Sequence, residues 1–572
     1  YPLRRQRQMC IRDSVDTEYD EFPLTDVQMA YLIGRNEGIA LGGISTHGYY
    51  EILTHLNIRK LEESLNKVIE IQPMLRAIIS KSGTQKILKE VPRYRISEND
   101  IRGYTDEEQE NVIKTERQRM SHYVFDTEKW PLFEFKAFRT DEEEYYLFVG
   151  IDLLIADGGS VRIFIRQLLD FYYDRFDKNR QNAFTFKDYV EALNDFSESS
   201  TYKEDKDYWM EQISLIPPAP MLPLQKDPSV IRKPQFARIE KVIPKSEWNV
   251  LQKEAKKKGI TTSTLLCTAY ALVLGYWSNQ PELTINVTVF TRYPFNEGVT
   301  DIVGDFTSVI LLRVNLLGRS DFWKLASEIQ NQLMDALEHR HYDGMNVIRK
   351  IAEQAEMKEQ AVMPVVFTSL LFSMEECDIV TIEDLGEVKM GVSQTSQVYL
   401  DYQVMETKEG LLITWDYIKE LFTPNMISTM FKQYINIVES LSKNVISMPH
   451  LDSKEQEVFT AYNDTKLDMP ILPIQTTFKK IAEKYPEKIL IADNTGGVTC
   501  HQVDKQSSQI ANYLLNQKIK RGDVIAVLGN RRKETIINIL GILKAGAAYV
   551  AIDPEYPEER KKYILSHSES VM

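Results

Sequence analysis

Hydrophobic positions along the chain follow two alternating spacings, which predict strands and helices in turn. Residues 145–151 form a nearly continuous apolar run typical of a buried strand, and residues 161–169 have the apolar spacing of a helix packed on it. Residues 283–292 alternate between apolar and polar, which predicts a strand with Asn286, Thr288 and Phe290 on one face. The sequence therefore predicts a mixed α/β fold.

Other segments extend this alternation toward both ends of the chain. Residues 56–70 are expected to form a helix and residues 74–79 a strand. The proline-rich stretch 217–224 must be extended and is interpreted as a linker between two lobes. After residue 446 the composition changes, and an exposed linker helix is expected near residues 450–459. Helix, strand, helix and strand are then predicted in order at residues 478–485, 489–492, 503–515 and 524–528.

Composition and charge narrow the class of protein. At 572 residues the chain is long enough for three to four compact units, given about 150 residues per domain. A formal net charge of −14 argues against nucleic acid or an anionic membrane as a partner. The longest apolar run, residues 265–277, is too short to span a bilayer and predicts a buried helix.

Cysteine usage suggests the compartment. Cys10, Cys267, Cys377 and Cys500 lie far apart and form no metal-ligand spacing with histidine, so we expect no metal site and a reducing, cytoplasmic setting.

Residues 1–20 are expected to be a non-native or disordered tail. Their first 14 residues carry four arginines against one acid and look more like translated adapter sequence than a targeting peptide.

Residues 152–160 carry the highest density of candidate catalytic side chains. Asp152, Asp157 and Ser160 follow the apolar run at a junction from strand to loop to helix, where side chains can face a cleft. Asp157 is also a candidate for a purely architectural ion pair, and Arg292, at the end of the later strand, is its expected partner. Asp152 is expected to bond backbone N–H groups of the loop rather than to act in chemistry.

The spacing D-x-x-x-x-D-x-x-S resembles the signature of heterocyclization domains of nonribosomal peptide synthetases, which are relatives of condensation domains. Condensation domains carry H-H-x-x-x-D-G there, whereas this chain has Asp152 and Leu153 in place of the two histidines. Leucine cannot shuttle a proton, and no two of the eight histidines are adjacent, which argues against a histidine-centred acyl transfer.

Further motifs follow in the order of that family. Residues 22–35 match F-P-L-T-x-x-Q-x-A-Y-x-x-G-R, residues 304–307 are G-D-F-T, and residues 364–371 are a strand-like run with two hydroxyls. Residues 393–401 match the segment ending T-P-Q-V-x-L-D, with Ser396 for the usual proline. The resemblance implies two chloramphenicol-acetyltransferase-like lobes around a central tunnel, over residues 21–185 and 186–446.

The remaining residues resemble the start of an adenylation domain. A linker is expected at residues 447–472, followed by a truncated adenylation domain at residues 473–572, where residues 543–557 resemble L-K-A-G-x-x-Y-V-P-I-D-P with Ala551 for proline. The chain ends before the family's phosphate loop and adenylate-forming lysine, so we interpret it as a fragment whose adenylation part is inactive. ATP and Mg²⁺ would serve only the full-length adenylation domain.

The resemblance implies condensation of a carrier-bound acyl thioester with carrier-bound Cys, Ser or Thr, followed by cyclodehydration to a thiazoline or oxazoline. The partners implied are upstream and downstream carrier domains with phosphopantetheine arms, and no cofactor is bound by the heterocyclization domain itself. The setting implied is secondary metabolite biosynthesis, including siderophores. Three alternatives stay open: an amide-forming condensation domain without cyclization, a degenerate carrier-docking module, and an adenylating ligase.

By the same resemblance, Asp401 is the acid/base group, with Thr368 bonded to it or to the leaving hydroxyl. A carboxyl in a tunnel of low dielectric has a raised pKa and can both give and take a proton. Asn286 is expected to orient a substrate carbonyl through its NH2 group, and Ser369 completes the expected catalytic set. The structural alternatives are that Thr368 and Ser369 only satisfy strand-end backbone groups and that Asn286 only bridges the lobes.

Overall fold

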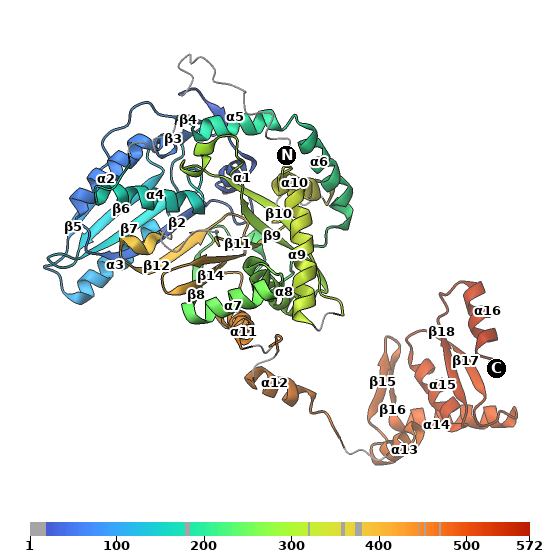
Figure 1. The fold of residues 1–572 in the computed structure, drawn as a ribbon. Helices are drawn as coiled ribbons and strands as arrows, with labels where there is room; N and C mark the ends of the chain where they lie inside the picture. Colours follow the sequence, from blue (N-terminus) through green and yellow to red (C-terminus); the bar gives the residue numbers. More distant parts are fainter. Residues whose placement is uncertain are drawn as a thin grey trace. The chain divides into compact units, whose positions relative to one another are not determined.

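The computed structural model describes residues 19–177, 183–318, 321–355, 361–371, 380–443, 446–450, 453–467 and 471–572. The chain divides into two compact units, Tyr1–His450 and Leu451–Met572, which are treated separately below (Figure 1). The predicted tail lies outside the described residues as far as residue 18, as do Cys10 and Cys377.

The first unit contains a five-stranded sheet in the order β12-β2-β7-β6-β5, with a small three-stranded sheet in the order β1-β4-β3. The strands are β1 Phe22–Pro23, β2 His47–Thr54, β3 Ala77–Ile79, β4 Thr84–Ile87, β5 Ser97–Asp100, β6 Phe133–Arg139, β7 Tyr145–Asp152 and β12 Glu387–Gln394. The helices of this region are α1 Asp26–Gly34, α2 Ile58–Ile71, α3 Asp106–Met120 and α4 Gly158–Tyr172. The predicted strand at 145–151 and the helix after it are confirmed as β7 and α4.

The second sheet of this unit has six strands in the order β10-β9-β11-β13-β14-β8. They are β8 Phe236–Pro244, β9 Glu282–Phe290, β10 Thr307–Asn315, β11 Val365–Ser369, β13 Leu400–Glu406 and β14 Gly410–Ile418. The remaining helices of the unit are α5 Phe186–Phe196, α6 Ser200–Gln212, α7 Lys245–Lys257, α8 Thr262–Ser278, α9 Phe322–Glu338, α10 Gly344–Gln354 and α11 Pro424–Ser442. Of these, α5 packs against β1 and the core of the first two sheets.

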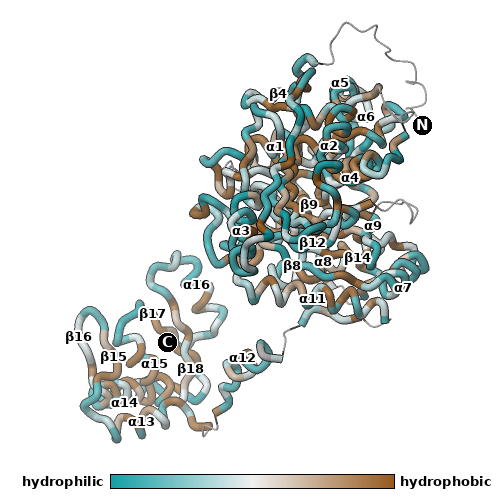
Figure 2. The backbone as a smooth tube through the Cα atoms, turned by 90° about the vertical axis from the view of Figure 1, so that its left-hand side faces the viewer, coloured by the Kyte–Doolittle hydropathy of each residue, from teal (hydrophilic) through white to brown (hydrophobic). Residues whose placement is uncertain are grey.

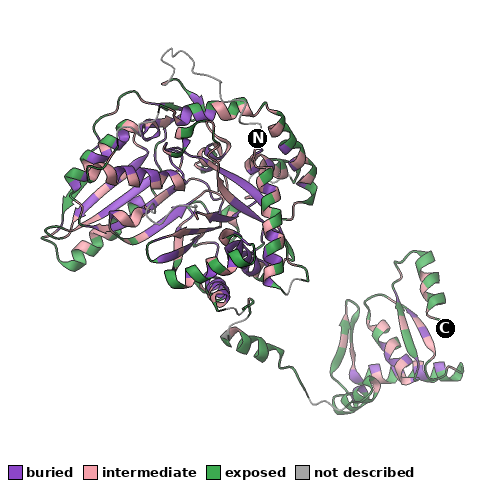
Figure 3. Ribbon diagram, viewed as in Figure 1, coloured by how far each residue is buried: buried purple, intermediate pink, exposed green. Residues whose placement is uncertain are grey.

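The hydrophobic pattern explains which elements lie inside. The middle of α8 is apolar on every side, and residues 264–275 are all buried, as expected for a core helix. Figure 2 shows the contrast between this helix and the more hydrophilic α7. Strands of both sheets are largely buried, whereas the outer faces of the surrounding helices are exposed (Figure 3). The predicted buried helix at 265–277 is thus confirmed.

One predicted strand is shorter than expected. Residues Pro73–Arg76 form a 3-10 turn, and only Ala77–Ile79 belong to a strand, β3. Proline fits the first position of such a turn because its fixed φ suits it and its missing N–H has no partner to satisfy there. The Arg76 guanidinium then donates to the carbonyl oxygens of Ile69 and Glu70 at the end of α2, at 2.6 and 2.8 Å, which fixes the bend.

The two predicted lobes share one strand that the sequence did not indicate. Strand β12 comes late in the chain, yet it pairs antiparallel with β2 at the edge of the five-stranded sheet. Just before it, Gly386 has φ +151°, and an added Cβ would lie 2.2 Å from the carbonyl oxygen of Leu53. Glycine therefore permits the close approach that brings β12 onto β2.

The second unit begins with an exposed helix, α12 Ser453–Asn463, and continues with the predicted alternation of helices and strands. Strands β15 and β16 pair antiparallel, and β17 and β18 pair parallel. The elements are α13 Ile474–Lys484, β15 Ile489–Asp493, β16 Gly496–Thr499, α14 Cys500–Asn516, β17 Val524–Leu528, α15 Lys533–Lys544, β18 Ala548–Ile552 and α16 Glu558–His567.

None of the described helices alone has the length and apolar character to cross a bilayer. Helices α7 and α8, which meet at 98°, are together long and apolar enough to do so, but most of α8 is buried inside the protein.

Candidate active site

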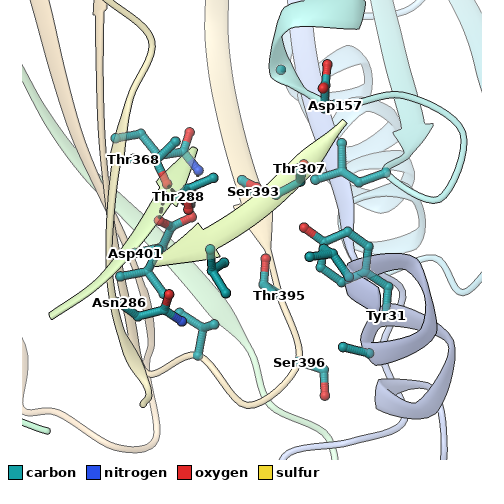
Figure 4. A pocket seen from close by; sticks show the side chains of 18 of the residues that line it. Tyr31, Asp157, Asn286, Thr288, Thr307, Thr368, Ser393, Thr395, Ser396 and Asp401 are labelled. Carbon is teal, nitrogen blue, oxygen red and sulfur yellow. Dashed lines mark hydrogen bonds between the residues drawn. The ribbon is translucent and has the colours of Figure 1, made fainter. Parts of the chain in front are cut away.

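A cavity of about 380 Å³ lies inside the first unit. Its walls come from α1, from β9, β11 and β13 of the six-stranded sheet, from α10 and from residues 393–398. Four of the predicted site residues, Asp401, Thr368, Asn286 and Asp157, are among those that line it, and Asp157 lies at its edge (Figure 4). Most of the remaining wall is apolar, which lowers the local dielectric and strengthens polar interactions within it.

The register of the sheet explains why residues distant in sequence meet at this wall. In β11, Val366 lies opposite Asn286 of β9 on one side and opposite Asp401 of β13 on the other. Two positions further along β11, Thr368 lies opposite Thr288 and Gln403. Because alternate residues of a strand share a face, these polar side chains form two adjacent rows on the same face of the sheet.

Asp401 and Thr368 are in contact, as predicted. The hydroxyl of Thr368 lies 3.4 Å from Oδ1 of Asp401 and 3.0 Å from the hydroxyl of Thr288. A single hydroxyl proton can serve only one of these bonds, so an un-ionised Asp401 can donate to Thr368 while Thr368 donates to Thr288. The three groups thus form a chain of hydroxyls that ends at a carboxyl.

Burial raises the pKa of Asp401 to about 7, with a smaller contribution from the nearby charge of Asp416. Hydrogen bonds from Gln403 and Thr368 oppose this by stabilising the carboxylate. The Gln403 amide donates to Oδ2 of Asp401 at 2.7 Å. A carboxyl with this pKa exists in both protonation states near neutral pH and can act as acid or base.

Gln403 and Thr288 are site residues to which sequence reasoning assigned no role. A signal for Gln403 was present, since it follows Asp401 by two positions in a strand and must therefore share its face. Thr288 was placed on the same face as Asn286, but nothing in the sequence indicated that β9 would lie beside β11 in parallel.

Asn286 lines the cavity, but within the described part of the chain its unpartnered atom is the amide oxygen rather than the expected NH2 group. Its NH2 group donates a long hydrogen bond, 3.5 Å, to the carbonyl oxygen of Met363. Its buried Oδ1 atom has no hydrogen-bond partner among the described residues. Asn286 therefore offers an acceptor, suited to a substrate N–H, rather than the predicted donor to a carbonyl.

Ser369 lies apart from the other three predicted catalytic residues. It follows Thr368 in β11, so its side chain leaves the opposite face of the strand. There its hydroxyl hydrogen bonds to Ser263 of α8 at 2.7 Å, and Ser369 is not one of the residues that line the cavity. This placement favours the structural role over the catalytic one.

Asp157 and Ser160 connect the motif loop to the G-D-F-T segment. Asp157 caps α4 by accepting from the N–H of Ser160 at 2.6 Å, and its other oxygen accepts from the N–H of Phe306 at 3.0 Å. The hydroxyl of Ser160 donates to the carbonyl oxygen of Gly304 at 2.6 Å. Both side chains are therefore committed to holding two loops together.

Arg292 joins the same network, as predicted. Its Nη2 lies 3.6 Å from Oδ1 of Asp157 and 2.8 Å from the hydroxyl of Ser160. The guanidinium also lies over the Phe306 ring, 3.8 Å from its centroid. The Asp157 side chain is 1% exposed and that of Arg292 17%, so the ion pair is largely buried. The Ser160 hydroxyl therefore lies closer to the guanidinium than the Asp157 carboxylate does.

Asp152 is fully buried and is not one of the residues that line the cavity. One carboxylate oxygen accepts from the N–H of Leu154 at 3.1 Å, which is the predicted bond to the loop backbone. The other pairs closely with the guanidinium of Arg35, which also donates to the Ser45 hydroxyl at 2.7 Å. Arg35 closes the F-P-L-T motif, and no part of the sequence pattern indicated that it would reach Asp152.

A second buried ion pair lies beside Asp401 in the same sheet. Arg238 of β8 donates to both oxygens of Asp416 of β14, at 2.9 and 2.7 Å. Asp416 lies directly opposite Asp401 in the sheet. Arg238 thus balances the charge of Asp416, and it also lowers the pKa of Asp401 slightly, against the larger effect of burial. Among the described residues, no group of three His, Cys, Asp or Glu side chains is arranged to hold a metal ion.

Comparison with protein families gives two matches along the chain. The condensation domain model matches residues 19–466, and the AMP-binding enzyme model matches residues 478–572. The first match covers most of the chain and contains every residue of the site described above.

Proteins with similar sequences include large synthetases. The chain is 38% identical over 552 residues to bacitracin synthase 1 of Bacillus licheniformis, covering 96% of this chain and 10% of that protein. It is 29% identical over 560 residues to phenyloxazoline synthase MbtB of Mycobacterium tuberculosis, covering 96% and 39%. The chain therefore spans between a tenth and two fifths of the length of these relatives.

A solved structure of similar size also resembles the first unit. The cyclization-docking bidomain of EpoB from Sorangium cellulosum, a nonribosomal peptide synthetase, superposes with a TM-score of 0.72 at 32% sequence identity. The match covers 77% of this chain and 89% of the bidomain.

Proposed function

The chain belongs to the condensation-domain family of nonribosomal peptide synthetases, and from this premise we propose that its first unit is a heterocyclization domain. It joins a carrier-bound acyl group to carrier-bound Cys, Ser or Thr and then closes a thiazoline or oxazoline ring. The observation that supports this proposal most is the Asp401–Thr368 contact on the cavity wall, which offers a proton-transfer group in a chain whose motif loop has Asp152 and Leu153 in place of the two histidines.

The reaction has three stages: amide formation, addition to the amide carbonyl and loss of water. First, the amine of the acceptor attacks the donor thioester, a C–N bond forms and the thiol leaves. Next, the acceptor's side-chain thiol or hydroxyl adds to the new amide carbonyl, and its proton goes to the carbonyl oxygen. Finally, the C–O bond breaks, the nitrogen loses its proton, and one water leaves as the C=N bond forms.

Asp401 is suited to the last of these steps. With a pKa of about 7 it can give a proton to the leaving hydroxyl and then, as a carboxylate, take the proton of the nitrogen. Thr368 holds Asp401 in position and can pass a proton to it. Asn286, through its unpartnered Oδ1, would accept from a substrate N–H and so orient the amide.

The partners follow from the substrates. Two carrier domains, one before and one after the condensation step, would present phosphopantetheine thioesters to the cavity. Asp157, Ser160, Arg292 and Asp152 are assigned structural roles, because their bonds hold loops together. The second unit would belong to an adenylation domain, and ATP with Mg²⁺ would serve only a complete one.

The test is an intact-mass measurement on the acceptor carrier. The chain is incubated with a donor carrier bearing an acetyl or benzoyl thioester and with acceptor carriers bearing Cys, Ser or Thr in separate reactions. The proposal predicts a product lighter than the linear amide by one water with at least one acceptor. Linear amide alone would identify an amide-forming condensation domain, and no product with any acceptor would identify a carrier-docking module.

A further inference from the structure

The cavity wall opposite Asp401 carries a tyrosine whose role is unassigned. Tyr31 lies on α1, and its ring lines the cavity. Figure 4 shows Tyr31 and Asp401 on opposite sides of the space, with the Tyr31 hydroxyl directed into it. The residue as a whole is partly buried. A substrate that occupies the cavity would therefore lie between a carboxyl and a phenol.

Two residues, Thr307 and Asp305, interact with the Tyr31 hydroxyl or with each other. Thr307 lines the cavity on the same side as Tyr31 (Figure 4). Its N–H donates to Oδ1 of Asp305 at 3.1 Å. Asp305 is completely buried, and its Oδ2 has no hydrogen-bond partner among the described residues. Hydrogen bonding by the Thr307 side chain lowers the pKa of both Tyr31 and Asp305, against the larger effect of burial. Thr307 thus connects a carboxyl in the core to the phenol in the cavity.

The raised pKa of Tyr31 suits a hydrogen-bond donor, because the phenol keeps its proton. Burial raises the pKa of the Tyr31 hydroxyl well above its ordinary value, and the charges of Asp305 and Asp401 raise it further. Burial likewise raises the pKa of Asp305 well above its ordinary value, with an added effect of the nearby Asp157. A phenol that keeps its proton can donate a hydrogen bond but cannot act as a base near neutral pH.

We propose that Tyr31 is a catalytic hydrogen-bond donor to the amide carbonyl oxygen during ring closure, with Thr307 and Asp305 as its positioning residues. This inference rests on the proposed function and adds the group that stabilises the oxygen on which negative charge develops. When the acceptor side chain adds to the carbonyl carbon, the C=O π bond breaks and its electron pair moves to that oxygen. Tyr31 donates to the oxygen without transferring its proton.

The assignment divides the chemistry between the two walls. The proton of the attacking thiol or hydroxyl becomes the proton of the new hydroxyl, and Asp401 moves the nitrogen proton to that hydroxyl as water leaves. Ring closure needs the donor more than amide formation does, because it attacks a resonance-stabilised amide with a poor leaving group rather than a thioester. Donors aimed at a developing oxyanion in a site of low dielectric contribute about 100-fold or more to rate.

The test isolates ring closure from amide formation. An acceptor carrier is loaded with N-acetyl-cysteinyl phosphopantetheine, so that only the loss of water remains, and its mass is followed over time with the full chain. Amide formation is measured separately with acetyl-loaded and cysteinyl-loaded carriers. Tyr31→Phe is compared with wild type and with Tyr399→Phe, which removes the same atom from a partly buried tyrosine outside the cavity.

We expect Tyr31→Phe to slow ring closure about 100-fold while amide formation falls by a smaller factor, and Tyr399→Phe to match wild type. Asp305→Asn should slow ring closure less than Tyr31→Phe does, and should add nothing to it in the double variant, because Asp305 acts through Tyr31. If Tyr31→Phe fails to fold, Thr307→Val provides the same test, with an expected loss of about tenfold, the size of one hydrogen bond.

Three outcomes would overturn the inference: ring closure unchanged in Tyr31→Phe, an equal fall of ring closure and amide formation, or additive losses in the double variant. In the first of these, a wild-type chain that still forms the ring leaves the proposed function intact. If wild type itself releases only linear amide, the proposed function fails, and the role of Tyr31 fails with it.

Discussion

Asp401 is a carboxyl group that pays a large desolvation cost in order to lie on an apolar cavity wall. Two neutral hydrogen-bond partners, Thr368 and Gln403, offset part of this cost, and no cation contacts the carboxyl directly among the hydrogen bonds and ion pairs of the described residues. Structural carboxylates are normally paired with a cation, as Asp416 is with Arg238. The difference between these adjacent carboxylates is the clearest sign at the residue scale that Asp401 serves chemistry.

The raised pKa of Asp401 predicts a pH dependence of stability. The folded value, about 7, is above the ordinary value of 3.8, so this group's contribution to stability is fully present below about pH 4 and is lost as pH rises through about 7. A difference of this size corresponds to about 4 kcal/mol. Asp401→Asn, which cannot ionise, should therefore gain stability relative to wild type between pH 5 and pH 8.

Denaturant unfolding at a series of pH values measures this difference. Asp174→Asn, at an exposed carboxyl, controls for the removal of one negative charge. Parallel stability curves for wild type and Asp401→Asn would mean that Asp401 is ionised at little cost and would remove the physical basis for its role.

Asp157 makes the opposite prediction, a loss of stability on removal. Its carboxylate caps α4, bonds the backbone of Phe306 and pairs with a largely buried Arg292. Asp157→Ala leaves that cation without its partner, so we expect a loss of about 3–5 kcal/mol in the free energy of unfolding. Asp174→Ala, which breaks an exposed pair with Lys60, should cost less than about 1 kcal/mol. Equal stability of the two variants would contradict the structural role.

Residue-scale prediction from sequence succeeded where the rule was local. Alternation along a strand correctly placed Asn286 and Thr288 on one face, and the contacts of Asp157 with Arg292 and of Asp401 with Thr368 are present. The pairing of Arg35 with Asp152 and of Arg238 with Asp416 was missed, because each joins elements that are far apart in the chain. The free oxygen of Asn286 depends on where one backbone carbonyl lies, which no sequence pattern encodes.

At the scale of elements, the late strand β12 is the feature that the sequence pattern did not reveal. An alternating strand shows that one of its faces is buried but not which sheet it joins, so residues 387–394 gave no sign that they leave their own lobe. The crossing matters for the site, because the residues after β12, including Thr395 and Ser396, form part of the cavity wall.

Gly386 offers a direct test of this crossing. An added Cβ would meet the carbonyl oxygen of Leu53 at 2.2 Å in addition to the strain of a positive φ, so Gly386→Ala should cost about 3 kcal/mol or more. Gly259 also has a positive φ, +70°, but open space around it, and Gly259→Ala should cost about 1 kcal/mol. The difference between their denaturation midpoints measures the close approach alone, and similar costs would contradict it.

At the scale of the whole molecule, the chain is two compact units with separate cores. The change in composition after residue 446 indicated this division, and the alternation of helix and strand in the second unit followed from its hydrophobic pattern. The arrangement of the first unit's sheets could not be derived in this way, since strand order depends on contacts between distant segments.

Separate cores predict two thermal transitions in calorimetry. Asp157→Ala should lower only the transition of the first unit. Gly541→Ala should lower only that of the second, because its added Cβ would lie 2.6 Å from the side chain of Ile510. A single transition that both variants shift together would show that the units unfold as one.

The central claim is that Asp401 and Thr368 close the ring, and one measurement tests it most directly. Donor and acceptor carriers loaded with acetyl and cysteinyl groups are given to wild type, Asp401→Asn, Thr368→Val and Ser369→Ala, and the acceptor carrier is weighed intact. Ser369→Ala is the matched control, because it removes the neighbouring hydroxyl from the other face of the same strand. The account predicts ring product from wild type and Ser369→Ala, and linear amide accumulating with Asp401→Asn and Thr368→Val. Ring formation at the wild-type rate by both of these variants would contradict it.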